Sequence, residues 1–255
     1  MLKKIDASLL IIFPIIAVFL TLYFQTNFLI SIFLFFGLPS LWFSYRTPGK
    51  ILKTLIFSLI FTLPMVLAID YIAGGDMSWY VNSIFPFRIL DVIPVEDFFF
   101  GFFMAYYTVI FYEHFLDKGK HNLVDKHMKY LIWPFLIIIA SVISSYLILG
   151  EPITIPYAYL WMGIILIIIP CLTFLSIFPK LLSKYVITGA YFFLLYLTLE
   201  LTALELNHWT FPGSNFIGWV EIFNYRFPFE ELFFWMGLST ISILSFFAFF
   251  DDDRK

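Results

Sequence analysis

The chain has 255 residues, of which 62% are apolar and only 13% are charged, and its mean hydropathy is +0.93. An ordinary soluble domain has about 45–50% apolar and about 25% charged residues, and a fold of this size has too little interior to bury so much apolar side chain. The composition excludes a water-soluble domain, a nucleic-acid-binding protein and a disordered protein. The net charge of −3 provides no basic field for a polyanionic partner.

Cysteine and glycine usage bears on cofactors. The single cysteine, Cys171, lies inside an apolar run, which excludes a disulfide framework and a cysteine-based metal cluster. Neither G-x-G-x-x-G nor a P-loop sequence occurs. We therefore expect no metal and no flavin or nucleotide bound through such loops.

Apolar runs recur along the whole chain. A membrane-spanning helix needs about 20 predominantly apolar residues. The runs lie near 7–24, 28–44, 51–69, 95–114, 130–149, 157–178, 184–204 and 229–250. This pattern predicts an all-α polytopic integral membrane protein with about eight transmembrane helices.

The basic residues alternate between the two ends of these predicted spans. Alternate connections and the two termini hold 13 of the 15 Lys and Arg residues, whereas the other side holds only Arg88 and Arg226. Basic residues accumulate on the cytoplasmic side of membrane proteins. The sequence predicts a multi-pass protein of the cell (inner) membrane with both termini in the cytoplasm, and two long outer connections near 70–94 and 205–228.

The chain contains one internal repeat. Segment 93–100, IPVEDFFF, recurs as segment 227–234, FPFEELFF, at a shift of 134 residues. Asp70 and Glu205 close the third and seventh runs, and Trp79 and Trp209 follow them. We expect two parallel four-helix repeats, 1–128 and 129–255, related by an axis along the membrane normal and forming one membrane domain.

The repeated motif carries two adjacent acids in each copy, Glu96 and Asp97 in the first and Glu230 and Glu231 in the second. Proline suits the first turn of a helix, and neighbouring helical residues point about 100° apart. One acid of each pair is therefore expected to face the bundle centre while the other reaches toward a loop or water. Helical spacing groups the first acid of each copy with nearby phenylalanines: Phe99, Phe100 and Phe103 in the first half, and Phe233 and Phe234 in the second.

Acids among aromatic side chains suggest proton chemistry. Burial favours the protonated form of an acid, and a neutral carboxylic acid can donate a proton. Aromatic faces stabilise cations. Acid, base and a dry aromatic lining are what a proton-initiated polyene cyclisation needs, although simple helix capping by the acids is the alternative.

Further candidates for the site are acids and tryptophans outside the motif. Glu200 lies inside the seventh run, and alignment of the halves gives it no acidic counterpart. Polar residues inside a membrane are functional candidates by default. We include Asp70, Glu200, Glu205, Trp79 and Trp209 as predicted lining residues, and we expect His208 to be interfacial.

The doubled Pro-x-Glu-[Glu/Asp]-x-Phe-Phe motif on a small polytopic chain resembles the lycopene cyclase family of archaea, fungi and actinobacteria, whose members are two small subunits or one fused chain. The resemblance covers the whole length. It implies conversion of the linear end groups of lycopene to β-rings without net redox change, with a lipophilic carotenoid substrate, no cofactor, and a helical fold akin to membrane prenyltransferases. It assigns proton handling to Glu96, Asp97, Glu230 and Glu231, although Asp97 replaces the usual second Glu.

Three other functional hypotheses are alternatives to the cyclase. A proton-coupled transporter or carotenoid-binding membrane protein fits parallel repeats with intramembrane acids. A prenyltransferase needs two Asp-rich Mg²⁺ motifs and basic residues for a diphosphate. An intramembrane protease of the Glu-Glu-x-x-x-Arg type is disfavoured, because Trp235 occupies the Arg position. The sequence does not predict an oligomeric state.

Overall fold

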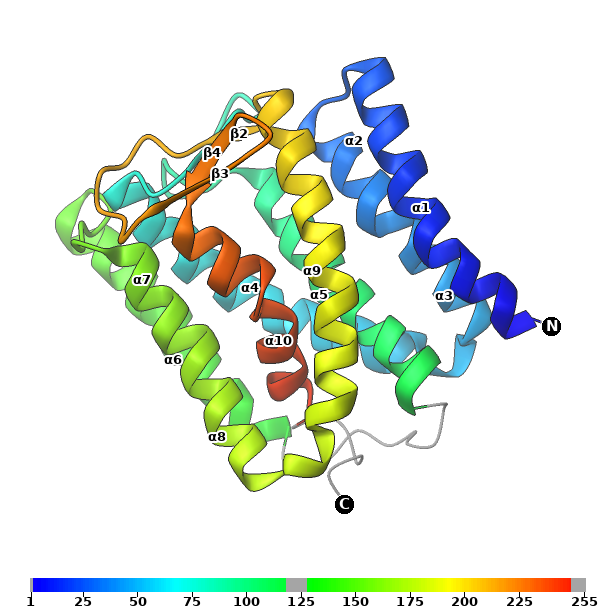
Figure 1. Cartoon of the computed structure of the whole chain (residues 1–255). Helices are drawn as coiled ribbons and strands as arrows, with labels where there is room; N and C mark the ends of the chain where they lie inside the picture. The colour runs from blue at the N-terminus through cyan, green and yellow to red at the C-terminus, as the bar shows by residue number, and fades with distance from the viewer. Residues whose placement is uncertain (1, 118–127, 249–255) are drawn as a thin grey trace.

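The computed structural model describes residues 2–117 and 128–248 and is mostly helical (Figure 1). In this part of the chain, six helices are long and apolar enough to cross a membrane. They are Lys4–Phe24, Phe28–Arg46, Pro48–Asp76, Ile132–Leu149, Ala158–Ile177 and Pro179–Glu205. The prediction of a helical protein with membrane-spanning character is confirmed at this level.

The first half runs from α1 to a short π-helical segment, η3. Its elements are α1 (Leu2–Phe24), α2 (Phe28–Ile32), η1 (Phe33–Gly37), α3 (Leu38–Arg46), η2 (Pro48–Lys50), α4 (Ile51–Asp76), β1 (Tyr80–Val81), α5 (Val95–Tyr112) and η3 (Glu113–Asp117). Asn27 starts α2 by accepting a hydrogen bond of 3.0 Å from the backbone N–H of Ile30, as an N-cap residue does.

The second half has a similar series of elements. They are α6 (Met128–Leu149), α7 (Ala158–Met162), η4 (Gly163–Ile168), α8 (Ile169–Ile177), η5 (Pro179–Leu181), α9 (Leu182–Glu205), β2 (Trp209–Thr210), β3 (Trp219–Ile222), β4 (Tyr225–Pro228), η6 (Glu231–Met236) and α10 (Ser239–Phe247). The π-helical segments η1 and η4 begin 130 residues apart, and in both halves a helix with proline in its first turn follows, at Pro39 and Pro170.

The motif-bearing helices lie in the interior of the bundle. Helix α5 packs against α3, α4, α9 and α10, and its residues 105–112 are all buried. Helix α10 packs against α8 and α9, and its residues 239–245 are buried (Figure 1). Neither α5 nor α10 is among the six long apolar helices, and their environment is largely other protein segments.

Two short antiparallel strand pairs close one end of the bundle (Figure 1). Strand β1 pairs with β2, opposing Val81 to Trp209, so the two long connections meet. Strands β3 and β4 form a hairpin that leads into the second motif. The first connection is shorter than predicted because α4 continues to Asp76. Asp70 ends the apolar run but is buried within the bundle, so the polar residue does not mark the end of the helix.

Candidate active site

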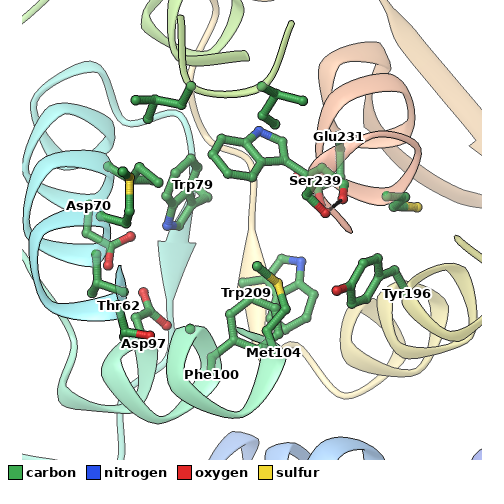
Figure 2. Close-up of a pocket in the computed structure, with 18 of the residues that line it drawn as sticks. Thr62, Asp70, Trp79, Asp97, Phe100, Met104, Tyr196, Trp209, Glu231 and Ser239 are labelled. Carbon is green, nitrogen blue, oxygen red and sulfur yellow. Dashed lines mark hydrogen bonds between the residues drawn. The ribbon is translucent and has the colours of Figure 1, made fainter. Parts of the chain in front are cut away.

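A cavity of about 180 Å³ lies between the two halves of the chain, enclosed by α4, α5, α7, η4, α9, η6 and α10 together with both connections (Figure 2). Most of its lining is apolar or aromatic. Four carboxyl groups line it: Asp70, Asp97, Glu200 and Glu231. The structure thus brings together acids from both halves, which the sequence places far apart.

Asp70 and Asp97 form a carboxyl pair on one wall of the cavity. Asp70 comes from α4 and Asp97 from the first turn of α5, and both are buried. Their side chains lie beside one another on this wall, and the Trp79 indole nitrogen points toward Asp70 (Figure 2). Two neighbouring carboxylates repel each other, so a proton on one of them is favoured. The pair is therefore built to hold a proton next to the cavity.

Glu200 lines the cavity from α9, in the second half of the chain. Its Oε1 accepts a hydrogen bond of 3.2 Å from Nε1 of Trp209. Trp209 follows Glu200 by nine residues, as Trp79 follows Asp70. This spacing matches Asp70 with Glu200, whereas the predicted alignment matched Asp70 with Glu205 and gave Glu200 no acidic counterpart. Glu205 is exposed at the end of α9 and accepts a hydrogen bond from the Tyr225 hydroxyl.

Glu231 enters the cavity from the wall opposite Asp70 and Asp97 (Figure 2). It begins the π-helical segment η6. Within the described residues its side chain has neither a hydrogen bond nor an ion pair. Nearby in the lining, Nε1 of Trp235 is also buried without a hydrogen-bond partner among these residues. Glu231 and Trp235 therefore offer unused polar atoms beside the cavity.

The first acid of each motif copy has a different role. Glu96 accepts hydrogen bonds from the Ser83 hydroxyl, at 3.0 and 2.8 Å to its two oxygens, and from the N–H of Ile84 at 2.6 Å. Glu230 accepts a hydrogen bond of 2.7 Å from the N–H of Ile217. Both are fully buried and do not line the cavity. They hold the outer connections onto the motif helices, whereas the predicted grouping placed Glu96 with the central aromatics.

The face of α5 that lines the cavity follows a regular helical spacing from Asp97, the second acid of the first motif copy. Asp97, Phe100, Gly101 and Met104 line the cavity at positions i, i+3, i+4 and i+7. This spacing defines one helix face. The sequence contains that pattern, but Gly101 and Met104 interrupt the aromatic run, so aromatic content alone selects the wrong face.

Only some of the predicted aromatic residues reach the cavity. Phe100, Trp79 and Trp209 line it, whereas Phe99 and Phe233 are exposed on the outside of the bundle. Phe103 packs edge-on against Phe33, and Phe234 is buried in the core. Sequence reasoning missed several lining residues that come from other helices: Tyr159, Tyr196, Trp235 and Ser239.

His208 lies beside the cavity but does not line it. It is buried, its Nε2 is 2.9 Å from the Ser31 hydroxyl oxygen, and its ring packs on Phe28. Burial lowers the pKa of His208 to about 4. His208 is therefore a packed residue that is neutral near pH 7, and its ring is not solvated.

The described residues contain no group of three or more His, Cys, Asp or Glu side chains arranged to hold a metal ion. Comparison of the chain with protein-family models, with curated proteins and with solved structures found no match. The chemistry of the cavity is accordingly argued from its own residues.

Proposed function

We propose that the protein is a membrane carotenoid cyclase that converts the linear end groups of lycopene to β-rings by proton-initiated, redox-neutral cyclisation. The observation that carries the proposal is the meeting of four carboxyl groups from both halves in one apolar, aromatic cavity. Protonation of an alkene needs a positioned acid, and quenching the resulting carbocation needs a base.

Asp97 is the proposed proton donor. An acid is strengthened when its conjugate base is stabilised. The positive charge of Arg88 acts on both Asp70 and Asp97 and stabilises the carboxylate that remains after the proton is donated. Asp97 also lies on the cavity-lining face of α5. These features favour the Asp70–Asp97 pair over Glu231, whose side chain makes no hydrogen bond or ion pair among the described residues.

The reaction balances without an oxidant or reductant. The O–H bond of Asp97 breaks as its proton forms a C–H bond at the terminal double bond. The neighbouring double bond supplies the electron pair that closes a six-membered ring, leaving a tertiary cation. A carboxylate from the second half of the chain, Glu200 or Glu231, takes a ring proton, and that C–H electron pair becomes the ring double bond.

The aromatic lining suits the cationic intermediate. Trp79, Trp209 and Tyr196 surround the space between the acidic walls (Figure 2). The negative faces of aromatic rings attract cations, by about 2 kcal/mol or more when water is excluded. The Trp209 indole also stabilises the Glu200 carboxylate through its 3.2 Å hydrogen bond, which supports a role as base.

The volume of the cavity supports one end group as its occupant. An apolar cavity of about 150 Å³ binds benzene, and this one has about 180 Å³. A six-membered ring fits, but a whole long polyene does not. The substrate would place one end in the cavity while the rest of its chain lies between helices or in the bilayer, and the two ends would react in turn.

The proposed membrane arrangement has eight spans in two parallel four-helix repeats, with both termini in the cytoplasm. The recurrence of elements at about 130 residues supports it, as does the pairing of the equivalent strands β1 and β2. In this arrangement α5 and the η6–α10 helix are the fourth span of each repeat, enclosed by the six apolar helices. The distribution of Lys and Arg supports the orientation.

Pigment analysis tests the function. The chain is expressed in a bacterial strain that accumulates lycopene, beside Asp97→Asn and Glu231→Gln variants at matched membrane levels. Ring-containing carotenoid from the wild type and its loss in Asp97→Asn are expected. Unchanged lycopene with well-folded wild-type protein in the membrane would refute the cyclase and favour the transporter or carotenoid-binding reading.

A further inference from the structure

Asp70 separates the central cavity from a second, outer pocket. This pocket, of about 240 Å³, is formed by the end of α4 and by the first connection. Asp70 and Trp79 line both the outer pocket and the central cavity. Arg88 and Asp91 also line the outer pocket. One carboxyl group thus faces the apolar reaction space on one side and a charged pocket on the other.

The outer pocket continues toward the surface. A third pocket, of about 590 Å³, lies under the same connection and shares Tyr80, Arg88 and Asp91 with the outer pocket. Asn82 and Ser83 add further polar groups to it. Tyr80 and Asp91 are exposed. Together the two pockets lead from the surface at this end of the bundle past Tyr80, Arg88 and Asp91 to Asp70. We name them the Arg88 vestibule.

Arg88 is fixed in the wall of this route. Its guanidinium donates hydrogen bonds to the backbone oxygens of Val92 at 3.0 Å and Val81 at 2.5 Å, and it lies 4.5 Å from the centre of the Tyr80 ring. These contacts use backbone oxygens and an aromatic face, so the positive charge stays available to the carboxyl groups nearby. Asp91 faces Tyr146 of α6, whose hydroxyl donates to it.

We propose that the Arg88 vestibule is a proton entry, through which water restores the proton of the Asp70–Asp97 pair after each ring closure. The inference rests on the proposed cyclase function, because that reaction is what consumes the proton. It goes beyond that function by assigning proton uptake to one half of the chain and to residues outside the reaction cavity.

The stoichiometry of the reaction explains why an entry is needed. Substrate and product are isomers, but after the reaction Asp97 has lost one proton and the accepting carboxylate, Glu200 or Glu231, has gained one. Both carboxyls return to their starting states only if a proton reaches the first and leaves the second. The central cavity is apolar and filled by substrate, whereas the vestibule can hold water in contact with polar groups.

Proton access can be measured without turnover. Protonated carboxyl groups give an infrared C=O band that shifts to lower frequency in D₂O, and the band that is lost in Asp97→Asn identifies the Asp70–Asp97 pair. Purified protein carrying Val92→Cys is transferred to D₂O before and after modification with a bulky methanethiosulfonate reagent, which forms a mixed disulfide with the introduced thiol. Val92 lines the outer pocket. We expect the label to slow exchange of this band at least tenfold and a reductant to restore it.

A matched control is Val220→Cys, in strand β3 of the other connection and outside the vestibule. Its label should leave the exchange rate unchanged. The native Cys171 is buried, and labelling is counted by mass spectrometry. Met77→Cys, which also lines the outer pocket, replaces Val92→Cys if that variant does not fold.

Three outcomes would overturn the entry: unchanged exchange after full labelling of the vestibule, equal slowing by the control label, or no carboxyl band that depends on Asp97. These results are independent of the pigment assay. If the protein cyclises lycopene but the label in the vestibule does not slow exchange, only the proton entry is refuted. If the label slows exchange but the protein forms no ring-containing carotenoid, only the cyclase function is refuted.

Discussion

Asp97 and Glu231 hold the same position in the two copies of the motif and enter one cavity from opposite walls (Figure 2). Asp97 is at the start of α5, and Glu231 is at the start of η6. Neither half of the chain alone encloses this space, because α4 and α5 supply one wall and η6 and α10 supply the other. The same motif position therefore places an acid at two different points of one cavity.

The second acid of each motif copy should matter for catalysis more than the first. Asp97→Asn keeps the shape of the side chain but removes the acidic proton, and a positioned general acid typically contributes about 10²–10⁴-fold. We expect a loss of ring formation of this size, measured as initial rate in isolated membranes. A rate within the range of the wild type would refute Asp97 as the donor.

Glu96→Gln should act on stability. Glu96 is fully buried and accepts from Ser83 and from the N–H of Ile84. An amide nitrogen at one of these positions would leave a donor unsatisfied, at a cost of about 1–3 kcal/mol. The expected result is a lower melting temperature in detergent. Activity per folded molecule should be largely retained.

Glu230→Gln provides a comparison for this prediction. Glu230 accepts only one hydrogen bond, from Ile217, and its Oε2 has no partner among the described residues. The amide can place its oxygen toward Ile217, so a smaller loss of stability is expected. A larger loss than for Glu96→Gln would contradict this account of the two acids.

Composition and spacing predicted the helical class, because it depends on local apolar content and on helix periodicity. Which acid of a pair faces the cavity depends on how α5 is rotated against α4, and no local pattern fixes that rotation. The phenylalanines of segment 98–103 point to all sides of the helix, so both Glu96 and Asp97 share a helix face with phenylalanines.

The pairing of Asp70 with Glu200 shows a different limit. An acid followed nine residues later by tryptophan occurs in both halves and was visible in the sequence. Alignment by the ends of the apolar runs matched Asp70 to Glu205 instead. Residues such as Tyr159 and Tyr196 reach the cavity through tertiary packing alone, and nothing in their own segments distinguishes them.

Removing the indole N–H that contacts Glu200 should slow the reaction. Trp209→Phe keeps an aromatic face but loses the 3.2 Å hydrogen bond to the carboxylate. Hydrogen bonds to charged groups contribute about 1.5–3 kcal/mol, so kcat should fall roughly 10–100-fold with a smaller change in KM. Trp235→Phe is the control, because Nε1 of Trp235 has no partner among the described residues. Equal losses in both variants would argue for packing as the cause.

The cavity size predicts the order of products. Because about 180 Å³ holds one end group, the two ends of lycopene should react in separate binding events. A carotenoid with one ring should appear first and reach its maximum before any product with two rings predominates. Chromatography of pigments at successive times after induction measures this order. Immediate appearance of two-ringed product without the intermediate would contradict the one-end model.

Acid should destabilise the protein partly through His208. Its pKa is lowered to about 4 by burial, against an ordinary value of 6.5. Between these values the unfolded chain binds a proton that the folded chain does not, so stability falls as the pH decreases. The difference corresponds to roughly 3 kcal/mol once the pH is below 4. His208→Gln can keep a hydrogen bond to Ser31 without titrating. Its melting temperature in detergent should therefore decline less than that of the wild type between pH 7 and pH 4.5. Parallel declines in the two proteins would show that His208 does not contribute to the acid sensitivity.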